Sequence, residues 1–100
     1  MNLKEMQKTV YQNKVDKGFN ITDVNKEFCL LYGEVSEAYD AWRKKRENVD
    51  EELADIAIYL LGLAEILGVD LAAAIENKMR INQNREYRML DGVMTRVSEE

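Results

Sequence analysis

The chain has no proline and only five glycines among its 100 residues. Both residue types interrupt helices, so their scarcity predicts long helices and few other elements. Hydrophobic residues make up 46% and charged residues 33% of the sequence. These proportions are typical of a globular protein and exclude a disordered one. The composition therefore predicts one all-α domain over residues 1–100.

Histidine is also absent, and cysteine occurs once, at Cys29. These absences exclude Ser–His and Cys–His nucleophiles within the chain, di-iron Glu-x-x-His sites, and the usual ligand sets of zinc. One cysteine can form no disulfide within the chain, and we expect Cys29 to be a small buried hydrophobic residue. Carboxylate, metal and water chemistry remains, which points to phosphate esters or anhydrides as substrates.

Long hydrophobic runs are missing as well. The longest run covers residues 56–64, much shorter than the roughly 20 residues of a membrane span. The first twelve residues are polar and do not resemble a secretory signal. The formal net charge of −5 argues against a nucleic-acid partner, which would need a basic face. We expect a cytoplasmic protein that binds neither a membrane nor nucleic acid.

Hydrophobic spacing and turn residues predict four helices, at about 3–15, 23–45, 50–67 and 71–88. The first should bury Leu3, Met6, Val10 and Val15. Thr22 or Asn20 is expected to cap the second helix, Asn48 with Glu51 to form a capping box on the third, and Asp70 to cap the fourth. Asp91-Gly92 predicts a turn, and the tail over residues 91–100 is expected to be frayed.

The third helix is apolar nearly all round after Asp55. Such a helix is buried on several sides, and a chain of this length has few other helices with which to cover it. We therefore expect a four-helix, bundle-like unit that assembles as a homodimer or as a tetramer made of two dimers.

Four carboxylates form two pairs with i, i+3 spacing, Glu34 with Glu37 and Glu52 with Asp55. Residues three apart lie on the same side of a helix, so each pair directs two acids toward one point. If the two helices pack together, repulsion and burial raise the pKa values of these acids unless a cation is bound. A set of oxygen ligands suits Mg²⁺ or Mn²⁺ better than zinc.

The alternative for these acids is a solvated helix face. It is most plausible for Glu52, which also benefits from the positive end of its helix dipole. Asp55 argues against it, because the residues around Asp55 are apolar. Taken together, the two pairs favour a metal site.

In this order and spacing the motifs resemble those of the MazG-like, all-α nucleoside triphosphate pyrophosphohydrolases. The family pattern is E-E-x-x-E, a spacer, and E-x-x-D. Here it reads Gly33-Glu34-Val35-Ser36-Glu37, then fourteen residues, then Glu52-Leu53-Ala54-Asp55. A later K-x-x-x-N-x-x-R pattern matches Lys78, Asn82 and Arg85. The likeness covers about residues 19–88, and it departs at Gly33, where many members have a glutamate that could contact substrate.

The resemblance implies a Mg²⁺-dependent enzyme that cuts nucleoside triphosphates between the α- and β-phosphates. Its products would be a nucleoside monophosphate and pyrophosphate, and Mn²⁺ is a possible substitute ion. Deoxy or non-standard nucleotides are the expected substrates, in nucleotide-pool house-cleaning. Glu34, Glu37, Glu52 and Asp55 carry over as metal ligands. We expect Glu37, or secondly Glu34, to act as general base on the attacking water.

Seven residues are candidates for substrate contact: Lys78, Asn82, Arg85, Trp42, Phe19, Lys17 and Tyr59. The three on the last helix would bind phosphate or sugar, although by themselves they suit a solvated polar face. Trp42 or Phe19 would stack on the base, with a core role equally open for Trp42. Lys17 would reach a phosphate. Tyr59, four residues after Asp55, would bond a ligand or the sugar, with packing as its alternative.

Two other functions remain open at this point. A related all-α hydrolase would act on dUTP/dUDP or phosphoribosyl-ATP. A non-catalytic helical module, acting as a regulatory partner, would keep the apolar seams but would have no need of Asp55 within an apolar helix.

Overall fold

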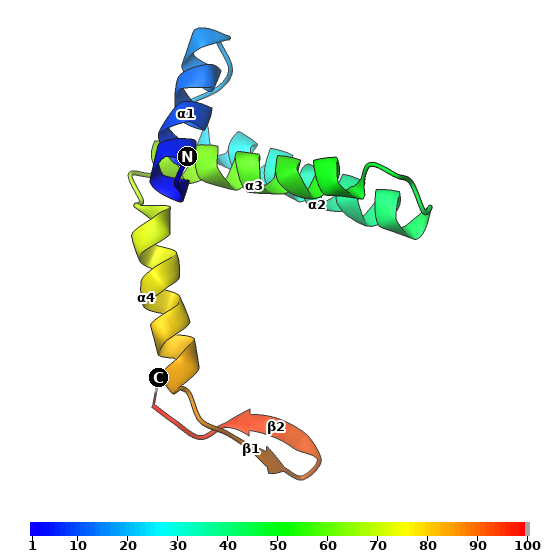
Figure 1. The fold of residues 1–100 in the computed structure, drawn as a ribbon, viewed down its shortest axis with the longest axis vertical. Coiled ribbons are helices and arrows are strands. Elements are labelled where there is room, and N and C mark those ends of the chain that lie inside the picture. Colours follow the sequence, from blue (N-terminus) through cyan, green and yellow to red (C-terminus); the bar gives the residue numbers. More distant parts are fainter. Residues whose placement is uncertain (100) are drawn as a thin grey trace.

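The computed structural model describes residues 1–99. The elements are α1 (Leu3–Asp16), α2 (Val24–Arg43), α3 (Val49–Ile66), α4 (Leu71–Asn84), β1 (Tyr87–Leu90) and β2 (Val93–Arg96). The prediction of four helices is confirmed, although the last one ends at Asn84 and not near Arg88. Figure 1 shows α2 and α3 side by side as an antiparallel pair, with α1 and α4 leaving one end of the pair in opposite directions.

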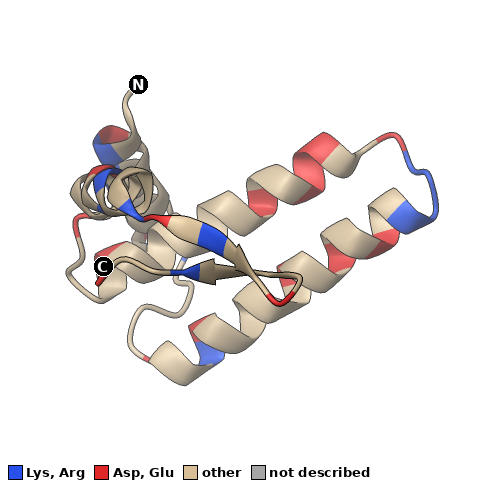
Figure 2. Cartoon of the chain, turned by 90° about the horizontal axis from the view of Figure 1, so that it is seen from below, with Lys and Arg blue, Asp and Glu red and all other residues tan. Residues whose placement is uncertain are grey.

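The α2–α3 pair is the framework of the site. A loop of five residues, 44–48, joins the two helices, and such short connections make helices antiparallel neighbours. Figure 2 shows acidic residues along both helices of the pair and basic residues at the loop that joins them. The packed part of the pair uses small residues, Ala38 and Ala41, which are 5% and 1% exposed. Small side chains let the two helices approach closely, and so bring their neighbouring side chains together.

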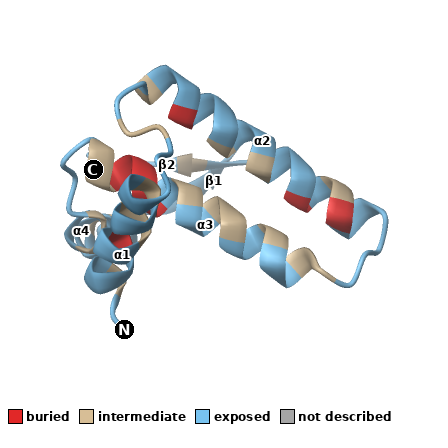
Figure 3. Ribbon diagram, turned by 90° about the horizontal axis from the view of Figure 1, so that it is seen from above, coloured by how far each residue is buried: buried red, intermediate tan, exposed pale blue. Residues whose placement is uncertain are grey.

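The buried core of the chain is small. Its hydrophobic members are Ala38, Ala41, Leu61, Leu63 and Ala64, and Figure 3 shows how little else is buried. The Cα radius of gyration is 17.1 Å, whereas a compact domain of this size has about 13 Å. Large apolar side chains are correspondingly exposed, including Trp42 at 66%, Met79 at 65% and Leu53 at 56%. Cys29, expected to be buried, is exposed, because this part of α2 is not covered by the rest of the chain, as the exposure of the neighbouring Phe28 and Leu30 also shows.

Two capping predictions are wrong. Asp23, and not Thr22 or Asn20, caps α2, because its side chain accepts a hydrogen bond from the backbone N–H of Lys26. Asn20 instead organises the preceding loop through bonds to the backbone of Asp23. Asn48 precedes α3 but makes no capping bond.

The predicted cap on α4 is confirmed. Asp70 accepts a bond from the backbone N–H of Ala73 at 3.1 Å. The Asn48–Glu51 capping box is absent, because Asn48 Nδ2 donates to the side chain of Glu52 at 3.2 Å.

The chain after α4 forms a β-hairpin, so the prediction of a frayed tail is wrong for residues 93–96. β1 and β2 pair in antiparallel register, with Met89 opposite Met94 and Leu90 opposite Val93. The predicted turn at Asp91-Gly92 joins them. These two residues have φ of +51° and +78°, the two positive values that a tight hairpin turn of this kind requires.

The inner face of α1 carries two polar residues in place of the expected apolar ones. Leu3, Gln7, Val10 and Lys14 point inward, whereas Met6 and Val15 are 41% and 42% exposed. Leu3 and Val10 thus lie on the inner face as predicted, whereas Gln7 and Lys14 take the places expected for Met6 and Val15.

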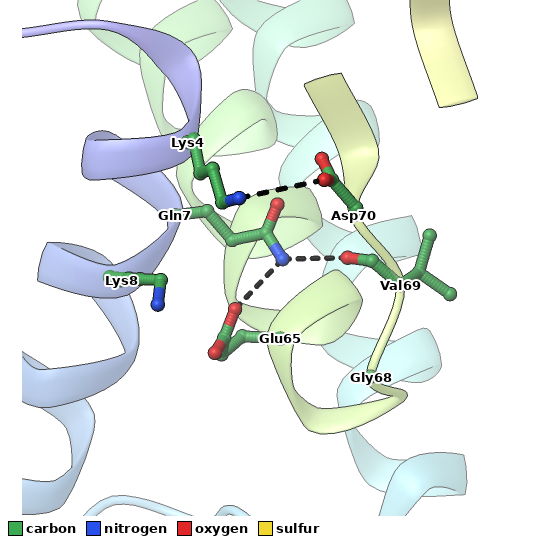
Figure 4. Close-up of a pocket in the computed structure, with 7 residues that line it drawn as sticks. All are labelled: Lys4, Gln7, Lys8, Glu65, Gly68, Val69 and Asp70. Atoms are coloured by element: carbon green, nitrogen blue, oxygen red, sulfur yellow. Dashed lines mark hydrogen bonds and ion pairs between the residues drawn. The ribbon is translucent and has the colours of Figure 1, made fainter. Parts of the chain in front are cut away.

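Gln7 connects α1 to the junction of α3 and α4, where the chain bends by 106°. Its Nε2 donates to Glu65 Oε2 at 2.9 Å and to the carbonyl of Val69 at 2.7 Å. Its Oε1 accepts from the backbone N–H of Leu71 at 3.3 Å. Figure 4 shows this side chain reaching from α1 to both segments, beside the Lys4–Asp70 ion pair. Gln7 is 5% exposed, so its bonds set the direction in which α4 leaves.

No single helix in residues 1–99 is both long and apolar enough to cross a membrane. Only α3 and α4 taken together reach that length and composition, across their bend.

We expect Gln7→Ala to lower the free energy of unfolding by about 3 kcal/mol, because three partly buried hydrogen bonds of this side chain are lost. Urea unfolding followed by circular dichroism measures the change. Gln12→Ala is the matched control, since Gln12 is exposed and bonds only to Asp16; it should cost less than about 0.5 kcal/mol. Equal losses in the two variants would contradict the role assigned to Gln7.

Candidate metal centre

Three carboxylates converge between α2 and α3. Carboxylate oxygens of Glu34, Glu37 and Glu52 all lie within 4.8 Å of one another. Glu34 and Glu37 are one turn apart on α2, and Glu52 comes from the first turn of α3. Sequence spacing predicted each pair, and the antiparallel packing of the two helices brings the pairs to the same place.

The fourth acid, Asp55, lies one turn beyond Glu52 on α3 and is partly buried. The negative charge of Asp55 acts on the cluster, because it contributes to the raised pKa of Glu34. Asp55 is not among the three residues whose oxygens meet within 4.8 Å. It therefore lies at the side of the cluster that faces the middle of α3.

The electrostatics of the cluster are unfavourable without a cation. Burial raises the pKa of Glu34 above its ordinary value of 4.5, and the negative charge of Glu37 raises it further. The charge of Asp55, a hydrogen bond with Glu37 and the charge of Glu52 act in the same direction. Within residues 1–99, none of the ion pairs found involves any of these four acids.

Two oxygens in the cluster lack partners. Glu34 Oε2 and Glu52 Oε2 are shielded from solvent and have no hydrogen-bond partner among the described residues. A buried acceptor without a partner is costly, and a bound hard cation would satisfy both oxygens at once. The set of donors, carboxylate oxygens only, is the one that Mg²⁺ and Mn²⁺ prefer. The residues present therefore fit a divalent metal ion.

Tyr59 connects the acid cluster to a neighbouring groove. Burial raises the pKa of the Tyr59 hydroxyl, and the charges of Glu34, Glu27, Asp55 and Glu37 raise it further. The groove has a volume of about 310 Å³. Its lining residues are Lys14, Gly18, Phe19, Asn20, Lys26, Glu27, Leu30 and Tyr59.

Two of the predicted substrate residues, Phe19 and Tyr59, therefore line one groove. Phe19 is 56% exposed and belongs to the loop between α1 and α2. Lys17, in the same loop, is not among the residues that line the groove.

Trp42 lies elsewhere, in a wholly apolar groove of about 340 Å³ near the other end of the α2–α3 pair. Its ring stacks on Tyr39 with centroids 6.1 Å apart. The lining residues are Val35, Ala38, Tyr39, Trp42, Val49, Leu53 and Ile56. The structure thus separates Trp42 from the groove that holds Phe19 and Tyr59.

The basic motif of the last helix is remote from the acids of its own chain. Lys78 and Asn82 are exposed on α4, which packs chiefly against α1 and points away from the α2–α3 pair (Figure 1). Arg85 is the residue just after the helix, where its Nη1 donates to Asn82 Oδ1 at 3.2 Å. Within the chain, the structure does not bring these three residues and the acid cluster together.

Sequence reasoning missed Lys14 and Glu27, a buried ion pair between α1 and α2. A signal for both was present, since Lys14 follows Val10 by one turn and Glu27 precedes Leu31 by one turn. Charged residues at such inward positions are unusual and need a partner. The sequence did not indicate which partner each one has.

We expect Glu34→Gln to stabilise the metal-free protein at neutral pH. Because the pKa of Glu34 is raised on folding, its contribution to stability is present below about pH 4.5 and is lost as the pH rises through the folded value. In EDTA, the variant should therefore melt higher than the wild type at pH 7, and the difference should shrink toward pH 4. Thermal unfolding of both proteins measures this.

Glu51→Gln, an exposed acid in the same turn as Glu52, is the control for that experiment. Adding Mg²⁺ should raise the melting temperature of the wild type more than that of Glu34→Gln, because ligand binding stabilises the folded state. A variant that is less stable than the wild type in EDTA at pH 7 would contradict the repulsion described above.

Comparison with known proteins gives three findings. The model of the MazG-like family matches residues 28–92. A dATP/dGTP diphosphohydrolase of Salmonella phage PMBT28 is 48% identical over 40 residues, which are 40% of this chain and only 14% of that relative's length. A solved structure, the cyanophage S-2L MazG-like pyrophosphohydrolase bound to dGDP and three catalytic Mn²⁺ ions per active site, is 25% identical. It superposes with a TM-score of 0.72, over 98% of this chain and 99% of that one. The chain belongs to the MazG-like family.

Proposed function

We propose that the chain is a Mg²⁺-dependent pyrophosphohydrolase of deoxynucleoside triphosphates, cutting between the α- and β-phosphates to give a monophosphate and pyrophosphate. The observation that carries this proposal is the convergence of Glu34, Glu37 and Glu52, two of which have a shielded oxygen with no hydrogen-bond partner among residues 1–99. The names of the two relatives, which mention dATP, dGTP, dGDP and Mn²⁺, support a purine deoxynucleotide as substrate and Mn²⁺ as a substitute ion.

The four acids would hold the divalent metal ions of the site. We assign Glu34, Glu37, Glu52 and Asp55 as ligands of the divalent ions. When bound, these ions neutralise phosphate charge and lower the pKa of a coordinated water. Asn48 donates to Glu52 Oε1 at 3.2 Å and so fixes the orientation of that carboxylate.

Glu37 is the acid to which we assign the proton from the attacking water, with Glu34 as the second choice. Glu37 is the exposed member of the converging trio, whereas Glu34 and Glu52 are partly buried. An exposed carboxylate oxygen can reach a water molecule outside the cluster, which is the geometric requirement for a general base.

Tyr59 and Phe19 would contact the nucleoside, because both line the groove beside the acids. Tyr59 follows Asp55 by one helical turn and lines the groove, and we assign its hydroxyl to a contact with the metal-bound ligand or the sugar. Phe19, at the exposed loop, would stack on the base. We assign Lys17 to a phosphate contact only secondarily, because it does not line the groove.

The proposal includes a homo-oligomer, either a dimer or a tetramer made of two dimers. The apolar groove around Trp42 and Leu53 has no polar lining, and its aromatic rings are largely exposed. A second α2–α3 pair laid against it would complete a four-helix bundle through a symmetric contact. In such an assembly α4 of one copy could supply Lys78, Asn82 and Arg85 to a substrate that another copy holds.

House-cleaning of the nucleotide pool in the cytoplasm is the setting that we propose for this activity. A hydrolase that destroys triphosphates without storing their energy serves to remove unwanted nucleotides.

We expect Asp55→Asn to lower turnover of dGTP by roughly a hundredfold or more, since even supporting residues of metal sites are worth 10- to 100-fold. Products are identified by chromatography after incubation with Mg²⁺ or EDTA. The wild type should release dGMP and pyrophosphate with Mg²⁺ only, and Glu51→Gln should match it. Release of orthophosphate would move the cleavage point, and Asp55→Asn with full activity would refute the ligand assignment.

We expect light scattering at micromolar concentration to give a mass of two or four chains. Leu53→Asp should lower that mass toward one chain, because it places a charge in the apolar groove. Val15→Asp, on an exposed part of α1, is the control and should leave the mass unchanged. A single-chain mass for the wild type would contradict the oligomer.

A further inference from the structure

An ion pair is buried beside the metal centre. Lys14 of α1 and Glu27 of α2 pair through Nζ and Oε1, with side chains only 13% and 3% exposed. The Lys14 ammonium also lies 5.7 Å from the centre of the Tyr59 ring. Gly62 of α3 makes room for the Lys14 stem, since a Cβ there would lie 3.2 Å from Lys14 Cδ. Three helices therefore hold the pair in place.

The pair is incomplete as a structural ion pair. Glu27 Oε2 is shielded from solvent and has no hydrogen-bond partner within residues 1–99. Buried ion pairs are stabilising only when their remaining oxygens are also satisfied. The Glu27 Oε2 atom therefore needs an additional hydrogen-bond donor, and the residues of α1, α2 and α3 do not supply one.

Both residues of the pair line the groove that also contains Phe19 and Tyr59. The charges of Glu34, Glu27, Asp55 and Glu37 all act on the Tyr59 hydroxyl, and the Lys14 ammonium lies 5.7 Å from the centre of the Tyr59 ring. The acid cluster and the Lys14–Glu27 pair therefore both lie near one tyrosine. A nucleotide with its phosphates at the acids would extend its base toward the pair.

We propose that the Lys14–Glu27 pair reads the base of the substrate and selects guanine, an assignment that rests on the function proposed above. The pairing edge of guanine presents an acceptor, O6, followed by two donors, N1–H and the 2-amino group. The Lys14 ammonium is a donor, and the two oxygens of the Glu27 carboxylate are acceptors. The order of donor and acceptors in the pair is complementary to guanine, and the contacts are charge-assisted.

Other bases make fewer of these bonds. In the orientation of guanine, adenine would present its 6-amino donor to the Lys14 ammonium and its N1 acceptor to the Glu27 carboxylate, so both contacts would be mismatched. Hypoxanthine matches guanine but lacks the 2-amino group, and so leaves one oxygen of Glu27 unpaired. A site built to hydrogen-bond a group discriminates strongly against an analogue without that group.

The comparison of dGTP with dITP isolates the contact, since only the 2-amino group differs. We expect the wild type to favour dGTP over dITP by about tenfold or more in kcat/KM, the worth of one bond to a charged group. In Glu27→Gln the ratio should fall to about one, because the amide offers one acceptor oxygen in place of two. Glu65→Gln, a partly buried acid in the pocket at Gln7, should keep the wild-type ratio.

Lys14→Met is the second variant. It keeps the stem that packs at Gly62 and removes the donor to O6, which dGTP and dITP share. We expect it to lower kcat/KM for both substrates equally and to leave their ratio unchanged. A structural role for the pair would change both variants alike, without moving the ratio in Glu27→Gln alone.

The affinities of dGMP and dIMP for the full chain with Mg²⁺, measured by calorimetry, separate this inference from the proposed function. If no triphosphate is hydrolysed, the proposed function fails, and the ratio of these two affinities still decides how the base is read. Equal affinities in the wild type, or a dGTP preference that survives in Glu27→Gln, would overturn the assignment.

Discussion

The crowding of carboxylates between α2 and α3 is the constraint on which the rest of the structure depends. Packing around Ala38 and Ala41 holds the two helices together, and the same contact forces Glu34 and Glu52 to bury oxygens that have no partner. Hydrophobic burial thus stabilises an electrostatically unfavourable cluster, and a bound divalent cation would reduce the repulsion. In the function that we propose, metal binding and stability are coupled, because the ion would satisfy the oxygens that folding leaves without a partner.

One face of α3 organises the site from end to end. Glu52, Asp55, Tyr59 and Gly62 follow one another at intervals of three or four residues and therefore lie along the same side of the helix. In order they contribute a carboxylate of the cluster, a second acid, a hydroxyl, and the space through which Lys14 passes. In the function that we propose, a nucleotide would lie along this row, with its phosphates at the acids and its base toward Gly62.

The helices and the acid cluster were predictable because both depend on local spacing. The i, i+3 spacing alone predicted which acids share a helix face. The packing of α2 against α3 then brings acids of the two helices together. The hairpin was predictable only as a turn at Asp91-Gly92, since its strands have no buried face to leave a pattern. The Lys14–Glu27 ion pair was missed because the two residues lie 13 positions apart in the sequence, on different helices. The charges alone do not indicate that two such residues are in contact.

Occupation of the acid cluster by a divalent ion is the central claim, and Mn²⁺ titration followed by electron paramagnetic resonance tests it most directly. The signal of free Mn²⁺ should stay low in the wild type until the site is filled, and should rise from the first addition in Glu34→Gln. Competition by Mg²⁺ should release the bound Mn²⁺. Equal free Mn²⁺ in the two proteins at every addition would contradict the account.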